Sequence, residues 1–199
     1  MTEDCRPRLL LVDDEPANLQ ILRHILQEDY RLLFARNGEK ALQLAADESP
    51  NLILLDVMMP DVTGLEVCRR LKATPATARI PVIFVTALDC ADAEARGLAL
   101  GAADYITKPI SAAVVKTRVR THLSLVREQR LEESYRDAIF MLGKAGHYND
   151  ADTGVHIWRM AAYSSALAAA AGWSAQACTQ LEMAAPMHDI GKLGIPDNI

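Results

Sequence analysis

Short aliphatic runs alternate with amphipathic segments through the first 110 residues, and this alternation constrains the fold more than any other feature. Five runs are predicted to be strands: Leu9–Val12, Tyr30–Phe34, Leu52–Leu55, Val82–Val85 and, more weakly, Asp104–Ile106. Between them apolar residues recur three or four positions apart, which is typical of helices with one buried face. Strands that alternate with helices form a parallel sheet covered on both faces. We therefore predict an α/β fold of (βα)5 type with a doubly wound, five-stranded parallel sheet.

A long helix is predicted after this domain, because residues 110–142 contain neither glycine nor proline and no strand-like run. Val115, Val119 and Leu123 form an apolar stripe, which charged residues at 127–130 interrupt before it resumes at Leu131. Two interpretations stay open. The helix either closes the first domain and continues as a solvated linker, or it is a stalk that pairs with a second copy of the chain.

Shorter helices are predicted beyond the long one. Gly143 and Gly146 are expected to break the long helix, and an alanine-rich helix is predicted over Thr153–Ala171. Ser174 is a candidate N-cap for a third helix, which Pro186 is expected to kink near its end. The C-terminal part is therefore predicted to be all-α.

Composition and charge exclude several classes of function. The 199 residues are 50% apolar, which suits one or two globular domains, and the net charge of −5 argues against a dedicated DNA-binding or membrane-surface protein. No apolar stretch approaches the ~20 residues of a membrane span, and the acidic N-terminus does not resemble a secretory signal. The four cysteines show no CxxC spacing. We expect a cytoplasmic protein with reduced thiols and no membrane span.

Polar side chains follow the predicted strands, where binding sites form in open α/β sheets. Asp13 and Asp14 follow the first strand, Asp56 the third, Thr86 the fourth and Lys108 the fifth. Clustered carboxylates favour a hard divalent cation such as Mg²⁺. Asp56 is the candidate nucleophile for an acyl phosphate, while Thr86 and Lys108 would contact the phosphoryl group. The sequence therefore predicts a phosphoryl-accepting site.

At residues 12–15, 55–64, 85–87 and 105–109 the chain resembles the receiver domains of two-component response regulators. The resemblance covers about residues 7–125 and implies a flavodoxin-like fold. It also implies a sensor histidine kinase or phosphotransfer protein as the phosphoryl donor.

This resemblance assigns roles to individual residues. Asp56 would be the phosphoacceptor, and Mg²⁺ would be bound by Asp13, Asp14, Asp56 and the main-chain carbonyl of Met58. Thr86 and Tyr105 would form the switch pair, and the peptide bond before Pro109 would be cis.

Receivers commonly orient a hydrolytic water with polar side chains two residues past the phosphoacceptor and two past the switch threonine. Met58 and Leu88 occupy those places here and are both apolar. We therefore predict slow loss of the phosphoryl group.

A second group of chemically active residues lies near the C-terminus. His188 and Asp189 are adjacent and His156 lies upstream on a predicted helix. Imidazole and carboxylate together are typical ligands of catalytic divalent metals. A metal bound there would activate water for attack on phosphorus.

Residues 152–160 and 184–197 resemble the beginning of HD-GYP domains, metal-dependent hydrolases of cyclic di-GMP that use two or three metals, commonly iron or manganese. The resemblance implies His156, His188 and Asp189 as ligands, with Lys192 at the substrate phosphate or leaving group. Many members have glutamate where this chain has Asp152, which would be a further ligand.

The later histidines and the Gly-Tyr-Pro loop of that family do not occur before Ile199. We divide the chain into a receiver (1–125), a helical linker or stalk (126–142) and the beginning of an HD-GYP domain (143–199). We expect weak metal binding and no phosphodiesterase activity from the chain as given.

The main hypothesis is a homodimeric response regulator in which phosphorylation of Asp56 controls a cyclic di-GMP phosphodiesterase of HD-GYP type. One alternative is a phosphorylation-dependent binding or dimerisation module with the HD segment as scaffold. Another is an HD phosphohydrolase that acts on nucleotides.

Overall fold

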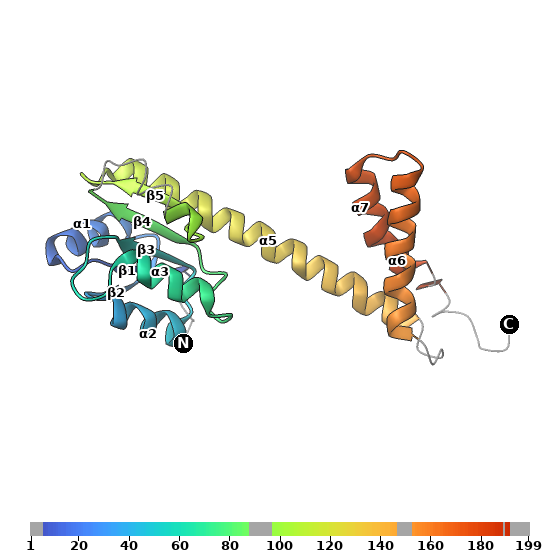
Figure 1. Cartoon of the computed structure of the whole chain (residues 1–199), viewed down its shortest axis with the longest axis horizontal. Helices are drawn as coiled ribbons and strands as arrows, with labels where there is room; N and C mark the ends of the chain where they lie inside the picture. Colours follow the sequence, from blue (N-terminus) through green and yellow to red (C-terminus); the bar gives the residue numbers. More distant parts are fainter. Residues whose placement is uncertain (1–5, 88–96, 147–152, 189, 192–199) are drawn as a thin grey trace. The chain divides into compact units, whose positions relative to one another are not determined.

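The computed structural model describes residues 6–87, 97–146, 153–188 and 190–191. Its contacts divide the chain into two units, Met1–Val126 and Arg127–Ile199 (Figure 1).

The first unit is built on a sheet of five parallel strands in the order β2-β1-β3-β4-β5. Its elements are β1 (Arg8–Val12), α1 (Pro16–Leu26), β2 (Arg31–Ala35), α2 (Gly38–Glu48), β3 (Leu52–Asp56), α3 (Gly64–Ala73), β4 (Val82–Thr86), β5 (Asp104–Thr107) and the first part of α5 (Ala112–Gly146). Every strand end lies within one residue of its predicted position. The predicted α/β fold with a five-stranded parallel sheet is confirmed.

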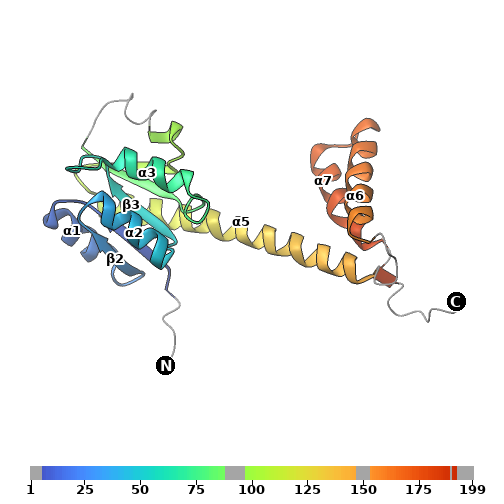
Figure 2. The same ribbon diagram turned by 60° about the horizontal axis from the view of Figure 1, so that its bottom comes forward.

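Two apolar layers enclose the sheet. Helices α2 and α3 cover one face, whereas α1 and the start of α5 cover the other (Figure 2). All residues of β3 and β4 are buried, which explains why these strands are uninterrupted apolar runs in the sequence. This burial holds the carboxyl ends of the central strands in fixed positions.

Local signals set the helix starts. Pro16 is the first residue of α1, where its missing N–H costs no helical hydrogen bond. The Asn37 side chain accepts a hydrogen bond from the Lys40 N–H at 2.8 Å and begins α2. The Ser174 hydroxyl accepts from the Ala177 N–H at 3.3 Å, as expected for an N-cap.

The second unit contains the rest of α5, then α6 (Thr153–Ala170), α7 (Ala175–Ala184) and the 3₁₀ turn η1 (Ala185–Met187). The prediction that Gly143 breaks the long helix is wrong, because α5 continues through it to Gly146. A Cβ at Gly143 would lie 2.7 Å from the Pro186 carbonyl oxygen. This glycine therefore permits a close approach of two backbones. Pro186 does not kink α7, which ends before it and gives way to η1.

The described cysteines, Cys68 and Cys178, are buried free thiols, while Cys5 and Cys90 lie outside the described residues. Within the described ranges, no helix has both the length and the hydropathy to cross a membrane.

Candidate functional site

Three carboxylates meet at the carboxyl ends of β1 and β3. Asp13, Asp14 and Asp56 each offer an oxygen within 4.8 Å of the others. Asp13 and Asp56 are buried and Asp14 is partly exposed. Such a set of closely spaced anionic oxygens suits a hard divalent cation with oxygen ligands. The structure thus brings together the three acidic residues that the sequence singled out.

Lys108 joins two of these carboxylates. It follows β5, and its Nζ donates to Asp13 Oδ2 and to Asp56 Oδ2, each at 3.0 Å. Burial lowers the pKa of the Lys108 ammonium, but the hydrogen bonds to Asp56 and Asp13 outweigh it and the pKa is raised. The lysine therefore stays charged between the Asp13 and Asp56 carboxylates. The Lys108–Pro109 peptide bond is cis, as the resemblance implied.

Asp13 is held by the turn that follows β1. Its Oδ1 accepts from the Glu15 N–H at 2.9 Å and from the Asn18 side-chain amide at 3.0 Å. Sequence reasoning missed Asn18, although its place in the first turn of α1 was a usable signal. Because both Asp13 oxygens accept hydrogen bonds, this carboxylate is fixed in orientation.

Asp56 lies at the end of β3 with its side chain 5% exposed. Burial raises the pKa of Asp56, and the charge of Asp13 adds to this effect. The hydrogen bond and charge of Lys108 and the Met58 N–H act in the opposite direction. The net direction is upward, so ionised Asp56 is less stable here than in water.

This raised pKa has a consequence for stability. The folded pKa exceeds the ordinary value of 3.8, so stability is greatest below that value and falls as pH rises through the folded pKa. Asp56→Asn removes the charge and is expected to raise the Tm at pH 7 in Mg²⁺-free buffer. The difference should shrink as pH falls toward 4, as measured by scanning calorimetry. Exposed Asp47→Asn is the control, and a Tm gain that grows on acidification would contradict the assignment.

Gly64 lets α3 begin directly against the end of β3, where Asp56 lies. Its N–H donates to the Val57 carbonyl at 3.0 Å. A Cβ at this position would overlap the Asp56 carbonyl oxygen and lie 2.9 Å from Val57 Cα. The end of β3 and the start of α3 can therefore approach this closely only because residue 64 has no side chain.

Thr86 and Tyr105, the predicted switch pair, line one small cavity. Thr86 is buried at the end of β4, Tyr105 is partly exposed on β5, and Phe84 and Leu98 contribute apolar walls. Neighbouring strands place them there, because Thr86 pairs with Thr107 and Phe84 with Tyr105 in the β4–β5 register. The two side chains therefore border the same cavity.

Asp104 ties β5 to α5, a connection that sequence reasoning missed. Its Oδ2 accepts from Arg118 Nη1 and contacts His122 Nε2, both at 2.9 Å, while Oδ1 accepts from the Tyr105 N–H. Arg118 and His122 are one helical turn apart on α5. Their spacing of four residues indicates that they share one face of a helix, but the sequence does not indicate that both would contact Asp104 on β5.

Met58 and Leu88 are the two apolar residues that are predicted to slow dephosphorylation. Met58 is 62% exposed beside Asp56, whereas Leu88 lies outside the described residues. The thioether of Met58 offers no strong hydrogen bond to a water molecule.

In the second unit, two predicted metal ligands lie close together. The rings of His156 on α6 and His188 after η1 have centroids 6.5 Å apart and meet edge to face. His188 Nδ1 lies 2.8 Å from the Ala185 carbonyl, which only accepts, so Nδ1 donates and Nε2 carries the lone pair in the neutral ring. That form of imidazole binds metals. Asp152, Asp189 and Lys192 lie outside the described residues.

Comparison with known proteins matches both parts of the chain. The response regulator receiver domain family matches residues 9–120. A Vibrio cholerae protein described as a probable cyclic di-GMP phosphodiesterase is 35% identical over 96% of this chain and 49% of its own length. The response regulator PleD of Caulobacter vibrioides is 45% identical over 57% of this chain and 25% of its own length. The chain thus spans half or less of these two curated relatives.

Solved structures agree with the fold of the first unit. A signal receiver domain from Vibrio parahaemolyticus has a TM-score of 0.61 and 30% identity, covering 64% of this chain and 98% of that domain. The recognition of a receiver followed by a segment similar to cyclic di-GMP phosphodiesterases is confirmed. From its matched residues and its fold, the chain belongs to the response regulator receiver domain family.

Proposed function

We propose that this chain is the phosphoryl-accepting part of a response regulator, with Asp56 as the acceptor. The observation that carries the proposal is that the Lys108 ammonium, which is partly exposed, bridges the buried carboxylates of Asp13 and Asp56 at 3.0 Å each. The donor would be a phosphohistidine on a sensor histidine kinase or a phosphotransfer protein, in the cytoplasm.

The transfer step follows from this geometry. A carboxylate oxygen of Asp56 attacks phosphorus, the P–N bond to the donor imidazole breaks, and the imidazole leaves with its bonding electron pair and takes up a proton. Lys108 is placed to move from Asp56 toward the arriving phosphoryl oxygens. Thr86, at the adjacent strand end, supplies a hydroxyl that can donate to one of them.

Mg²⁺ would be bound by Asp13, Asp14, Asp56 and the Met58 carbonyl. The three carboxylates fit the ion because their oxygens lie within 4.8 Å of one another. Bound Mg²⁺ would neutralise charge on the transferring group. Tyr105 would then fill the space beside Thr86 when the hydroxyl moves toward the phosphoryl group.

Phosphorylation by acetyl phosphate tests this function. We expect labelling with Mg²⁺ and none with EDTA, followed by decay over minutes or longer because Met58 does not orient a water molecule. Met58→Asn should shorten the lifetime at least about tenfold, since a polar group there can position the attacking water. Radiolabel decay measures both. Labelling that survives EDTA would contradict the metal site, and a wild-type lifetime of seconds would contradict the role of Met58.

The output would be a cyclic di-GMP phosphodiesterase of HD-GYP type. The similarity of the second unit to a Vibrio cholerae protein of that description and the nearness of His156 to His188 support this proposal. His156, His188 and Asp189, with Asp152, would bind iron or manganese, and Lys192 would contact the substrate phosphate. The bound metals would supply an activated water.

Phosphorylation is also expected to promote a homodimer through α5. Leu131, Tyr135 and Leu142 are each about half exposed at spacings of four and seven, as in a helical seam. Beryllofluoride should therefore raise the mass measured by light scattering, and Leu131→Glu should prevent this. Gln129→Glu, an exposed change outside the seam, is the control. An unchanged wild-type mass would exclude dimer signalling.

A further inference from the structure

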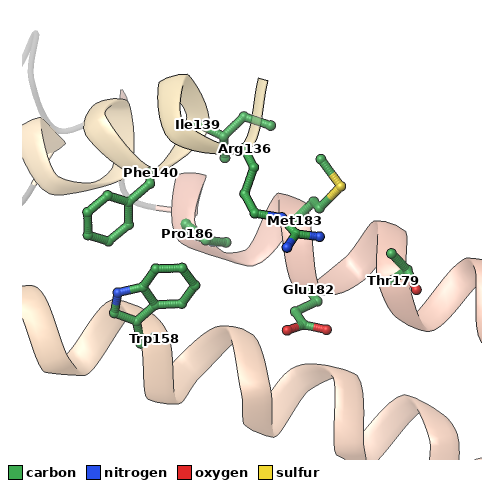
Figure 3. Close-up of a pocket in the computed structure, with 8 residues that line it drawn as sticks. All are labelled: Arg136, Ile139, Phe140, Trp158, Thr179, Glu182, Met183 and Pro186. Carbon is green, nitrogen blue, oxygen red and sulfur yellow. The ribbon is translucent and has the colours of Figure 1, made fainter. Parts of the chain in front are cut away.

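The end of α5 contacts both segments that carry the described histidines of the second unit. Phe140 stacks on Trp158 of α6 with ring centroids 4.9 Å apart and planes at 25°. Gly143 faces Pro186 of η1 so closely that a Cβ would lie 2.7 Å from the Pro186 carbonyl oxygen. Figure 3 shows Phe140 above Trp158, with Pro186 beside the same turn of α5.

These contacts lie two residues from each histidine. Trp158 follows His156 along α6, so Trp158 cannot shift with its helix without carrying His156. Pro186 precedes His188, whose Nδ1 donates to the carbonyl of Ala185 within the same turn. The two histidine-bearing segments therefore share one neighbour, the Phe140–Gly143 turn of α5.

The two contacts differ in tightness. Gly143 is packed closely against η1, where Pro186 Cβ would lie 3.1 Å from an added Cβ, whereas the stacked rings of Phe140 and Trp158 line a pocket and Trp158 is 51% exposed. A close-packed backbone contact transmits displacements. A shift of this turn is therefore expected to move Pro186 directly and Trp158 through the ring stack.

We propose that Phe140 and Gly143 are positioning residues that set the separation of His156 from His188. The proposal rests on the proposed function only where it treats His156 and His188 as metal ligands. The effect on the two rings is expected with or without a metal. Through it, α5 would adjust a metal site that it does not itself touch.

Histidine ring spectra of the full chain test this proposal. We expect the NMR signals of His156 and His188 to shift in Gly143→Ala and in Phe140→Leu, while those of His24 and His122 in the other unit stay in place. Met141→Ala, a 70% exposed neighbour on the same turn, should leave all of them unchanged. If Gly143 mattered only for the stability of α5, Gly143→Ala would stabilise the helix by ~1 kcal/mol and leave both histidine signals in place.

Zn²⁺ titration supplies a second readout at the same rings. The concentration needed to move His156 and His188 should rise about tenfold or more in Gly143→Ala and Phe140→Leu, the usual effect of losing support behind a ligand. Unshifted ring signals in both variants would overturn the proposal. If Zn²⁺ moves neither ring in the wild-type chain, the metal-site part of the proposed function fails, and the metal-free spectra still decide the positioning role.

Discussion

Asp56→Asn is expected to abolish labelling of the chain by acetyl phosphate in the presence of Mg²⁺. The amide has no anionic oxygen to attack phosphorus, and no other acidic residue lies at the end of β3. Because the amide has nearly the size and shape of the carboxylate, it fits the same buried position, and its oxygen can still accept a hydrogen bond from Lys108. The loss should therefore be chemical and not a loss of fold.

The control for this experiment is Asp47→Asn, which removes an exposed carboxylate on α2. It should label like the wild-type chain. The Tm of the same Asp56→Asn sample is measured at pH 7. The expected rise relative to the wild-type chain would establish that the variant is folded. Retained labelling of folded Asp56→Asn would refute the acceptor assignment.

Gly64→Ala is expected to lower the free energy of unfolding of the first unit by about 3 kcal/mol. The added Cβ would overlap the Asp56 carbonyl oxygen and approach the Asp56 carbonyl carbon to 2.9 Å. These are backbone atoms of a fully buried strand, which cannot move aside as a flexible side chain could. Phosphorylation should slow as well, because the displaced backbone is that of the proposed acceptor, Asp56.

Hydrogen exchange of the β3 amides, measured at increasing urea concentration, reports the free energy of unfolding of the first unit alone. Gly97→Ala is the matched control, since the nearest atoms to its Cβ are ring carbons of Phe84 at 3.0 and 3.1 Å. An aromatic ring can tilt, so this variant should lose clearly less stability. Equal losses in the two variants would mean that the close approach at Gly64 is not what constrains the loop.

The sheet and the acidic cluster could be predicted because both depend on local patterns. A strand buried on both faces must be apolar throughout, so β3 and β4 are visible as runs. Parallel strands bring their carboxyl ends to one edge, so residues that directly follow the runs must meet. Asp13, Asp56 and Lys108 are therefore predictable neighbours even though they are far apart in the sequence.

Contacts between helices could not be predicted, because no sequence pattern specifies them as strand order specifies which strand ends meet. Gly143 was expected to end a helix, since glycine is a poor helix former, but its packing against Pro186 decides its role. The stack of Phe140 on Trp158 depends on how two helices meet, which periodicity does not specify. That Lys108 bridges two carboxylates, and not one, likewise depends on side-chain geometry.

Asp104 couples the local unfolding of β5 to that of α5. Its two oxygens divide between the Tyr105 amide on its own strand and the Arg118 and His122 side chains on α5. A fluctuation that peels β5 from the edge of the sheet must therefore break these polar bonds to α5 too. Strand and helix should therefore open together as one cooperative segment, and the sheet edge at β5 is protected by the helix that follows it in the chain.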